Sequence, residues 1–164
     1  MSTKFWINRI HSSDNRADLS HPIKEPNDIA ISNSQTNSQV EVDLRGNPSD
    51  TKTKIAQGDI VYIAVSGFYQ FADGEKRNSL RIVAKGVADQ VYYRTETGGD
   101  IPVVVFVQGS FEHMTAPMLN GLDVRLLNKE YRNYESPIQS PYWSISADEA
   151  SYIDKNIFSG TKNI

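Results

Sequence analysis

Hydrophobic and polar residues alternate with a period of two in several short segments, a pattern typical of half-buried β-strands. In residues 4–11, Phe5 and Ile7 alternate with Trp6 and Asn8, which predicts an opening strand. Alternating runs predict further strands at residues 39–44, 80–88 and 121–127, and continuous apolar runs rich in β-formers predict strands at 60–66 and 101–107. Residues 90–94 are expected to continue or flank the strand at 80–88. We therefore expect a protein built mainly from β-structure.

The segment around which the other strands are expected to assemble is residues 58–88. Its first half is an apolar run bounded by Gly58 and Gly67, which favours a fully buried strand. Its second half alternates, so that one face is expected to carry Leu80, Ile82 and Ala84 and the other Arg81, Val83 and Lys85. The two halves predict a hairpin.

The connection within this hairpin is predicted to be a long loop that carries Phe68, Tyr69 and Phe71. Aromatic residues on a loop, rather than in a core, indicate a binding surface.

A helix is predicted to begin after Ser146. Ser146 and Glu149 have the spacing of a capping box, and Ala150, Ile153 and Ile157 follow at helical spacing. With the strands and a long polar loop at residues 12–39, the prediction is an α+β fold: a β-barrel of about six strands, closed at one end by this C-terminal helix. Residues 1–158 are expected to form a single domain, with 159–164 as a tail or the start of a linker.

Composition narrows the functional classes. The chain has 164 residues, no cysteine and no apolar run long enough to cross a bilayer. Disulfides and thiolate metal sites are excluded, and the expected location is the cytoplasm.

Charge is distributed unevenly although the net charge is only −3. Residues 76–94 hold five bases and one acid (5 − 1 = +4), whereas residues 140–154 hold three acids and no base (−3). A local basic patch is sufficient for phosphate contacts. A solvated face of one sign explains the same pattern equally well.

Catalytic and cofactor motifs are absent from the sequence. The three histidines are scattered, and there is no phosphate-binding loop, dinucleotide fingerprint or nucleophile elbow. We therefore expect no catalytic residues, no metal site and no cofactor, with any nuclease or motor activity on a separate domain or subunit.

The order of these features resembles the PUA-like superfamily, in particular its EVE and YTH-like domains. The resemblance is carried by an aromatic opening strand at residues 5–9, a Gly-Asp-x-Val element at residues 58–66 and a strand with a small residue and glycine at residues 82–88. It covers residues 4–127 in order. Arg9-Ile10 stand where the family has Lys-Ser, and residues 30–34 lack the aromatic residue of the YTH type.

This resemblance implies a nucleic-acid reader, with DNA preferred over RNA, that accommodates a flipped and sometimes modified base in an aromatic pocket. Such domains serve as specificity modules of restriction systems. The residues expected to contact nucleic acid are Trp6, Asn8, Arg9, Asn15, Arg16, Ser66, Gly67, Phe68, Tyr69, Arg77, Arg81, Lys85 and Trp143.

Several of these residues also fit other roles. Trp6 and Trp143 suit core packing better than base stacking, and Asn15 and Arg16 suit a capping or turn role. The runner-up function is a small barrel that binds a peptide, small molecule or protein partner through the loop carrying Phe68 and Phe71. A barrel-type nuclease or RNA-processing enzyme ranks third.

Overall fold

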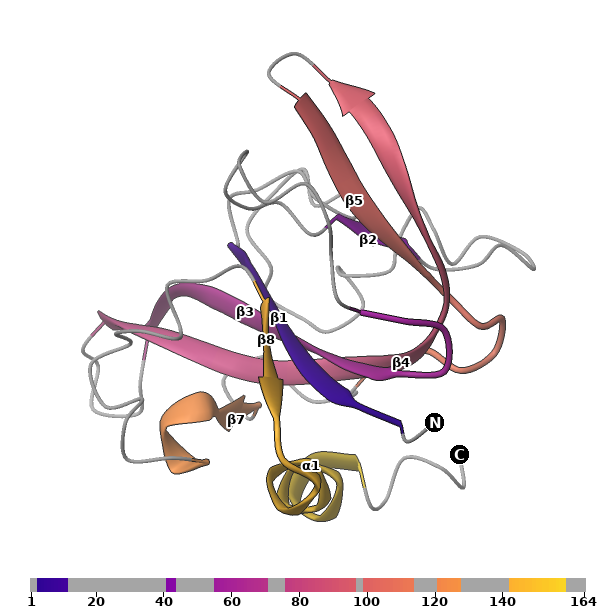
Figure 1. Cartoon of the computed structure of the whole chain (residues 1–164). Helices are drawn as coiled ribbons and strands as arrows, with labels where there is room; N and C mark the ends of the chain where they lie inside the picture. Colours follow the sequence, from indigo (N-terminus) through magenta and orange to yellow (C-terminus); the bar gives the residue numbers. More distant parts are fainter. Residues whose placement is uncertain are drawn as a thin grey trace.

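The computed structural model describes residues 3–11, 41–43, 55–70, 76–96, 99–113, 121–127 and 142–158. Within them the α+β class is confirmed: a mixed β-sheet is accompanied by a C-terminal helix (Figure 1). The strands are β1 Phe5–His11, β2 Glu41–Asp43, β3 Ile60–Gln70, β4 Lys76–Glu96, β5 Gly99–Phe106, β6 Glu112–His113, β7 Leu122–Asp123 and β8 Tyr142–Ile145. A 3-10 helix, η4, spans Val124–Leu126, and α1 (Ala147–Ile153) continues into a π-helix, η6 (Asp154–Phe158).

The sheet has the strand order β2-β5-β4-β3-β1-β8, and β6 and β7 pair with β4 outside this path. β1 and β3 are parallel, whereas the other pairs are antiparallel. Among the strands that the structure describes, no pairing joins β2 to β8, so the predicted barrel is not closed.

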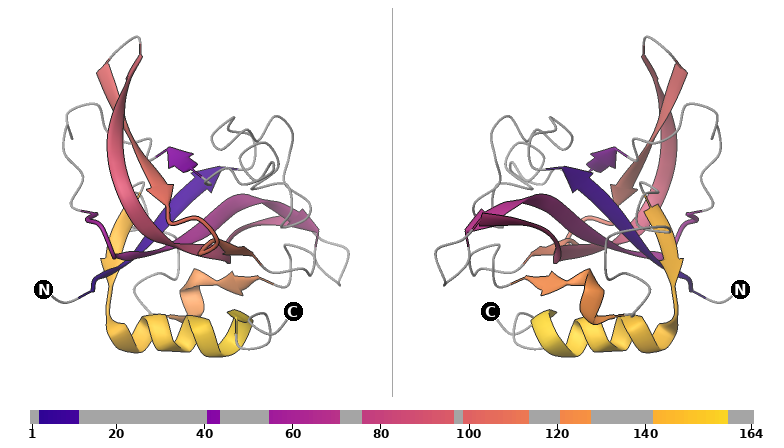
Figure 2. Two further views of the ribbon diagram at one scale, coloured as in Figure 1. Left: turned by 90° about the vertical axis from the view of Figure 1, so that its right-hand side faces the viewer. Right: turned by 90° about the vertical axis from the view of Figure 1, so that its left-hand side faces the viewer.

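Strand β4 explains the curvature of the sheet. It is 21 residues long and pairs with β3 through its first half and with β5 through its second. Figure 2 shows it bending so that β5 rises away from the side on which α1 lies. Register shifts occur at Ile63/Ala64 on the β3 side and at Ala88/Gln90 on the β5 side. Such bulges increase local bend and twist.

Because of the first of these bulges, the predicted assignment of residues 80–88 to the two faces is wrong. Ile63 pairs with Ala84 but Ala64 pairs with Ile82, so Val83 is the extra residue and the alternation reverses there. Leu80 and Ile82 belong to the hydrophobic cluster beneath α1, whereas Val83 and Ala84 belong to the cluster on the other face.

The hairpin connection is also shorter than predicted. Phe68 and Tyr69 lie in β3, where they pair with Asn78 and Arg77, and not in a loop. The polar character of residues 76–79 suggested a loop, but cross-strand pairing extends the ladder through them. Phe71 lies outside the described residues.

Two predictions near the C-terminus need correction. Residues 121–127 form the two-residue strand β7 followed by η4, because the side chain of Asp123 accepts a hydrogen bond from the backbone N–H of Arg125 and so caps the 3-10 helix. Strand β8 was not predicted, and it places Trp143 in the sheet.

The capping box of the C-terminal helix is confirmed: Ser146 accepts a hydrogen bond from the backbone N–H of Glu149, and the Glu149 carboxylate accepts one from the backbone N–H of Ser146. The helix covers one face of the sheet (Figure 2), rather than one end of a barrel. Ala150, Ile153 and Phe158 pack into the hydrophobic cluster on this face.

The Gly-Asp pair before β3 joins the beginnings of the central strands. The buried carboxylate of Asp59 accepts hydrogen bonds from the backbone N–H groups of Lys4 (3.1 Å) and Ala56 (3.0 Å) and from Nε1 of Trp6 (3.0 Å). Gly58 adopts a left-handed conformation (φ 90°), and its N–H donates to the carbonyl of Ala88. One carboxylate thus holds β1, the turn and β3 together.

We predict that Asp59→Ala lowers the free energy of unfolding by about 3 kcal/mol, because it leaves three donors without their acceptor. Urea unfolding at pH 7 measures the loss. The control Asp148→Ala, at an exposed position in the first turn of α1, should cost less than about 1 kcal/mol. Equal losses in the two variants would contradict the role assigned to Asp59.

Gly86 provides a second test of the packing. A Cβ at this position would lie 2.5 Å from Cδ1 of the Phe106 ring. We predict that Gly86→Ala costs about 1–3 kcal/mol through this overlap. The added variant Phe106→Leu should recover part of the loss, so that the double variant is more stable than the sum of the single effects predicts. Gly58→Ala, which meets no atom within 4 Å, should show no such coupling with Phe106.

Candidate nucleic-acid interface

Each face of the sheet carries its own hydrophobic cluster. The face beneath α1 holds the cluster that includes Ile7, Tyr62 and Trp143, and the opposite face holds the cluster that includes Trp6, Ile63 and Val83. Each predicted contact residue can therefore be assigned to one face or the other where its side chain is described.

On the α1 face, polar groups are bound to one another. The Oδ1 atom of Asp154 accepts hydrogen bonds from the hydroxyl of Tyr62 and from Nζ of Lys85, both at 2.9 Å. Nζ of Lys85 also lies 3.8 Å from the Glu112 carboxylate and 5.0 Å from the centre of the Phe158 ring. These contacts attach the terminal helical segment to β3 and β4.

Burial raises the pKa of Tyr62 well above its usual range, and the hydrogen bond to Asp154 and the charges of Asp154 and Glu112 raise it further. The phenol therefore stays protonated and acts as a donor to Asp154. Lys85 is buried and ion-paired with Asp154 in this cluster, so its predicted phosphate contact does not fit the structure.

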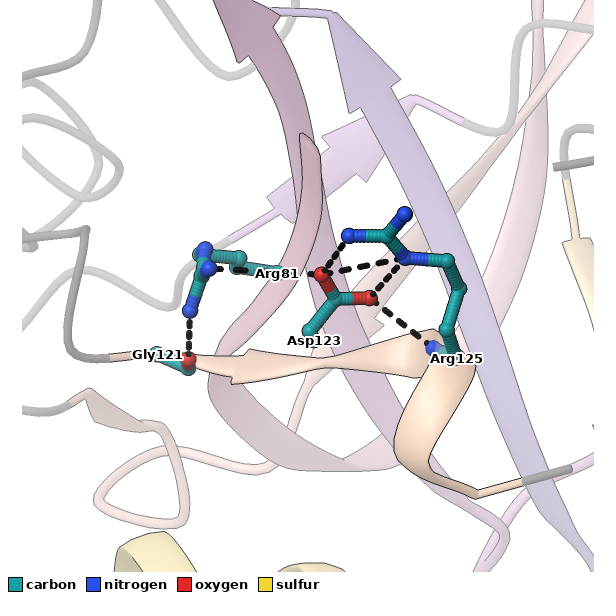
Figure 3. Close-up of polar contacts among 4 residues, drawn as sticks. All are labelled: Arg81, Gly121, Asp123 and Arg125. Atoms are coloured by element: carbon teal, nitrogen blue, oxygen red, sulfur yellow. Dashed lines mark hydrogen bonds and ion pairs between the residues drawn. The ribbon is translucent and has the colours of Figure 1, made fainter. Parts of the chain in front are cut away.

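On the opposite face, Arg81 and Arg125 lie on either side of the Asp123 carboxylate (Figure 3). The Arg125 guanidinium donates from Nη2 (2.7 Å) and Nε (3.1 Å), and its backbone N–H donates at 2.9 Å. Nη2 of Arg81 lies 3.9 Å from Asp123, and Nη1 donates to the carbonyl of Gly121. Two guanidinium groups and one carboxylate give this cluster a net charge of about +1.

The groups in the cluster differ in exposure. The side chain of Asp123 is 9% exposed and that of Arg81 14%, whereas that of Arg125 is 40% exposed. Arg125 is therefore the member that an incoming anion can reach.

The pKa of Asp123 reflects opposing effects. Burial raises it, but the hydrogen bonds from the Arg125 side chain and backbone, together with the charges of Arg125 and Arg81, lower it below its ordinary value. The carboxylate is ionised at neutral pH and holds both guanidinium groups in place.

The remaining predicted contacts divide between the faces. Trp6 is 6% exposed and donates to Asp59, and Trp143 is equally buried beneath α1, so both have core roles. Asn8 lies on the face of Arg81, whereas the alternation of β1 places its neighbour Arg9 on the other face. The structure therefore does not bring Asn8 and Arg9 together.

Some predicted residues are located only along the backbone or lie outside the described residues. Ser66, Gly67, Phe68 and Tyr69 follow one another in β3, and Arg77 pairs with Tyr69 from β4. Asn15 and Arg16 lie outside the described residues.

Sequence reasoning missed Arg125 and the roles of Asp59 and Asp123. An aspartate such as Asp123 often accepts a hydrogen bond from the backbone N–H two residues later, here that of Arg125, and this could have been predicted from the sequence. An alternating apolar pattern in the same segment obscured it.

No family model, curated protein or solved structure matches the chain in the three comparisons. Within the described residues, no helix is long and apolar enough to span a membrane, and no group of three or more histidine, aspartate or glutamate side chains is placed to hold a metal ion.

We predict that Asp123→Asn destabilises the protein by about 2 kcal/mol at pH 7. The folded-state pKa is lowered, so the carboxylate contributes stability above the unfolded pKa of about 4, and the contribution disappears as pH falls through the folded value. The difference between wild type and variant should therefore shrink below about pH 4. Urea unfolding at pH 7, 5 and 3 measures it, and a difference that does not change with pH would exclude this electrostatic role.

Proposed function

We propose that the chain is a nucleic-acid-recognition module that binds through the sheet face opposite α1. The observation that carries the proposal is the Arg81–Asp123–Arg125 cluster on that face, with the Arg125 side chain 40% exposed. Guanidinium groups bind phosphate with a geometry that lysine does not reproduce. A carboxylate that holds two of them in place reduces the entropy lost when a phosphate binds.

The finer proposal is a PUA-like reader of an extruded, sometimes modified base, with DNA preferred over RNA. It rests on the resemblance of residues 5–9, 58–66 and 82–88 to EVE and YTH-like domains. The sharp bend of β4 is compatible with a sheet that curls around a binding site (Figure 2). The cellular role would be the specificity module of a restriction-type system, with catalysis on a separate domain or subunit.

The structure supports a reduced set of contact residues. Arg81 and Asn8 stay in the set, Arg125 enters it, and Lys85 leaves it because its ammonium is ion-paired with Asp154 on the α1 face. The alternative of a partner-binding loop with Phe68 and Tyr69 is not favoured, since both residues lie within β3.

Fluorescence anisotropy on short duplexes tests the proposal. The panel contains unmodified DNA, DNA with methylated adenine or with methylated or hydroxymethylated cytosine, single strands and matching RNA, each at two salt concentrations. We predict binding to DNA whose affinity falls as salt rises, and a preference for one modified or unpaired base. Absence of binding to every probe at low salt would refute the proposed function.

The variant Arg125→Ala should weaken binding and reduce the slope of log K against log salt by about one, because one phosphate contact is lost. The matched control is Lys155→Ala, which removes an exposed cation from the terminal helical segment on the other side of the sheet. An equal effect of the two substitutions would show that nonspecific charge, and not this face, governs binding.

A further inference from the structure

Asn8 occupies an unfavourable position for an amide. It is fully buried, and neither Nδ2 nor Oδ1 makes a hydrogen bond to any part of the chain that the structure describes. Buried polar groups in native proteins almost always have partners, because an amide loses its hydrogen bonds to water on burial. An amide left in this state requires an explanation.

The described neighbours of Asn8 on the adjacent strands surround its amide with apolar and aromatic side chains. Asn8 pairs with Ile63 in the adjacent strand β3 and with Tyr142 in the adjacent strand β8. Tyr142 packs edge-on against Trp6, with ring centres 5.9 Å apart, and Ile63 is fully buried. A leucine would suit such apolar and aromatic surroundings better than an asparagine, so folding alone does not account for the amide.

The same amide is well suited to a flat ligand edge. A carboxamide presents an acceptor beside a donor, and asparagine forms paired hydrogen bonds with the amino group and ring nitrogen of adenine. An adjacent aromatic ring such as Tyr142 provides a stacking partner for a base. Asn8 also shares its sheet face with the Arg81–Asp123–Arg125 cluster, which would bind phosphate.

We propose that Asn8 is the specificity-determining residue of this face and that its carboxamide pairs with the amino-and-ring-nitrogen edge of an extruded adenine. This inference rests on the proposed nucleic-acid function. Because Asn8 is fully buried, a base must open this face to reach it, which favours a base that is already unpaired.

Stability of the free protein gives the first test. Removal of an unpartnered buried amide should not destabilise the fold, so Asn8→Leu is expected to raise the midpoint of thermal unfolding by about 2–4 °C. If the amide has a structural partner, Asn8→Leu will lower the midpoint instead, and the inference is overturned. The reference for such a loss is Ile63→Ala, which truncates the neighbouring core residue and should lower the midpoint. A lower midpoint in Asn8→Leu could also come from overpacking by the larger leucine. Asn8→Ala adds no volume, so a lower midpoint in this variant as well would point to loss of a structural partner and not to overpacking.

Binding gives the second test, with full-length protein and a duplex that carries one unpaired adenine. Replacement of that adenine by purine, which lacks the amino group, should weaken wild-type binding about tenfold or more. In Asn8→Leu and Asn8→Ala the two probes should bind equally. A purine penalty that persists in both variants would overturn the role of Asn8 and leave the proposed function intact. Failure of the wild type to bind any probe would overturn the proposed function and this inference with it.

Discussion

The carboxylate of Asp59 determines how the central strands begin. Parallel pairing of β1 with β3 joins segments that are more than fifty residues apart, and the hydrogen bond between Trp6 and Asp59 spans 53 positions. The Asp59 hydrogen bonds to Lys4 and Trp6 lie beside the first register pair, Phe5 with Ile60, and stabilise that register. A slip of one residue would exchange every side chain of β1 between the two faces of the sheet. The face on which Asn8 lies therefore depends on the register that this hydrogen bond helps to fix near the start of β1.

The bulge at Val83 has a comparable effect on charge. In an uninterrupted strand Arg81 and Lys85 would lie on one face and form a single basic patch. The extra residue sends Lys85 beneath α1, where Asp154 neutralises it, and leaves Arg81 on the opposite face beside Asp123. The positive charge available to a ligand is consequently smaller than residues 76–94 indicated, and it is supplemented by Arg125 from outside that range.

Sequence patterns predicted the features that depend on local chemistry. The alternation of residues 4–11 gave β1, and the spacing of Ser146 and Glu149 gave the start of α1. Features set by pairing between distant segments were not predictable in the same way. Phe68 and Tyr69 belong to β3 because β4 pairs with them, and the face of Lys85 depends on a bulge that leaves no compositional trace. The partners of Asp59 and Asp123 required the three-dimensional structure for the same reason.

The polar side chains on the two faces of the sheet have different environments. Beneath α1, Tyr62, Lys85 and Asp154 bind one another, and the raised pKa of Tyr62 keeps its hydroxyl protonated as a donor within the cluster. These three side chains therefore have their partners within the fold. On the opposite face, Asn8 has no described partner and Arg125 extends toward solvent. Because a buried amide without a partner costs stability, the position of Asn8 on this face supports the proposal that the face binds a ligand.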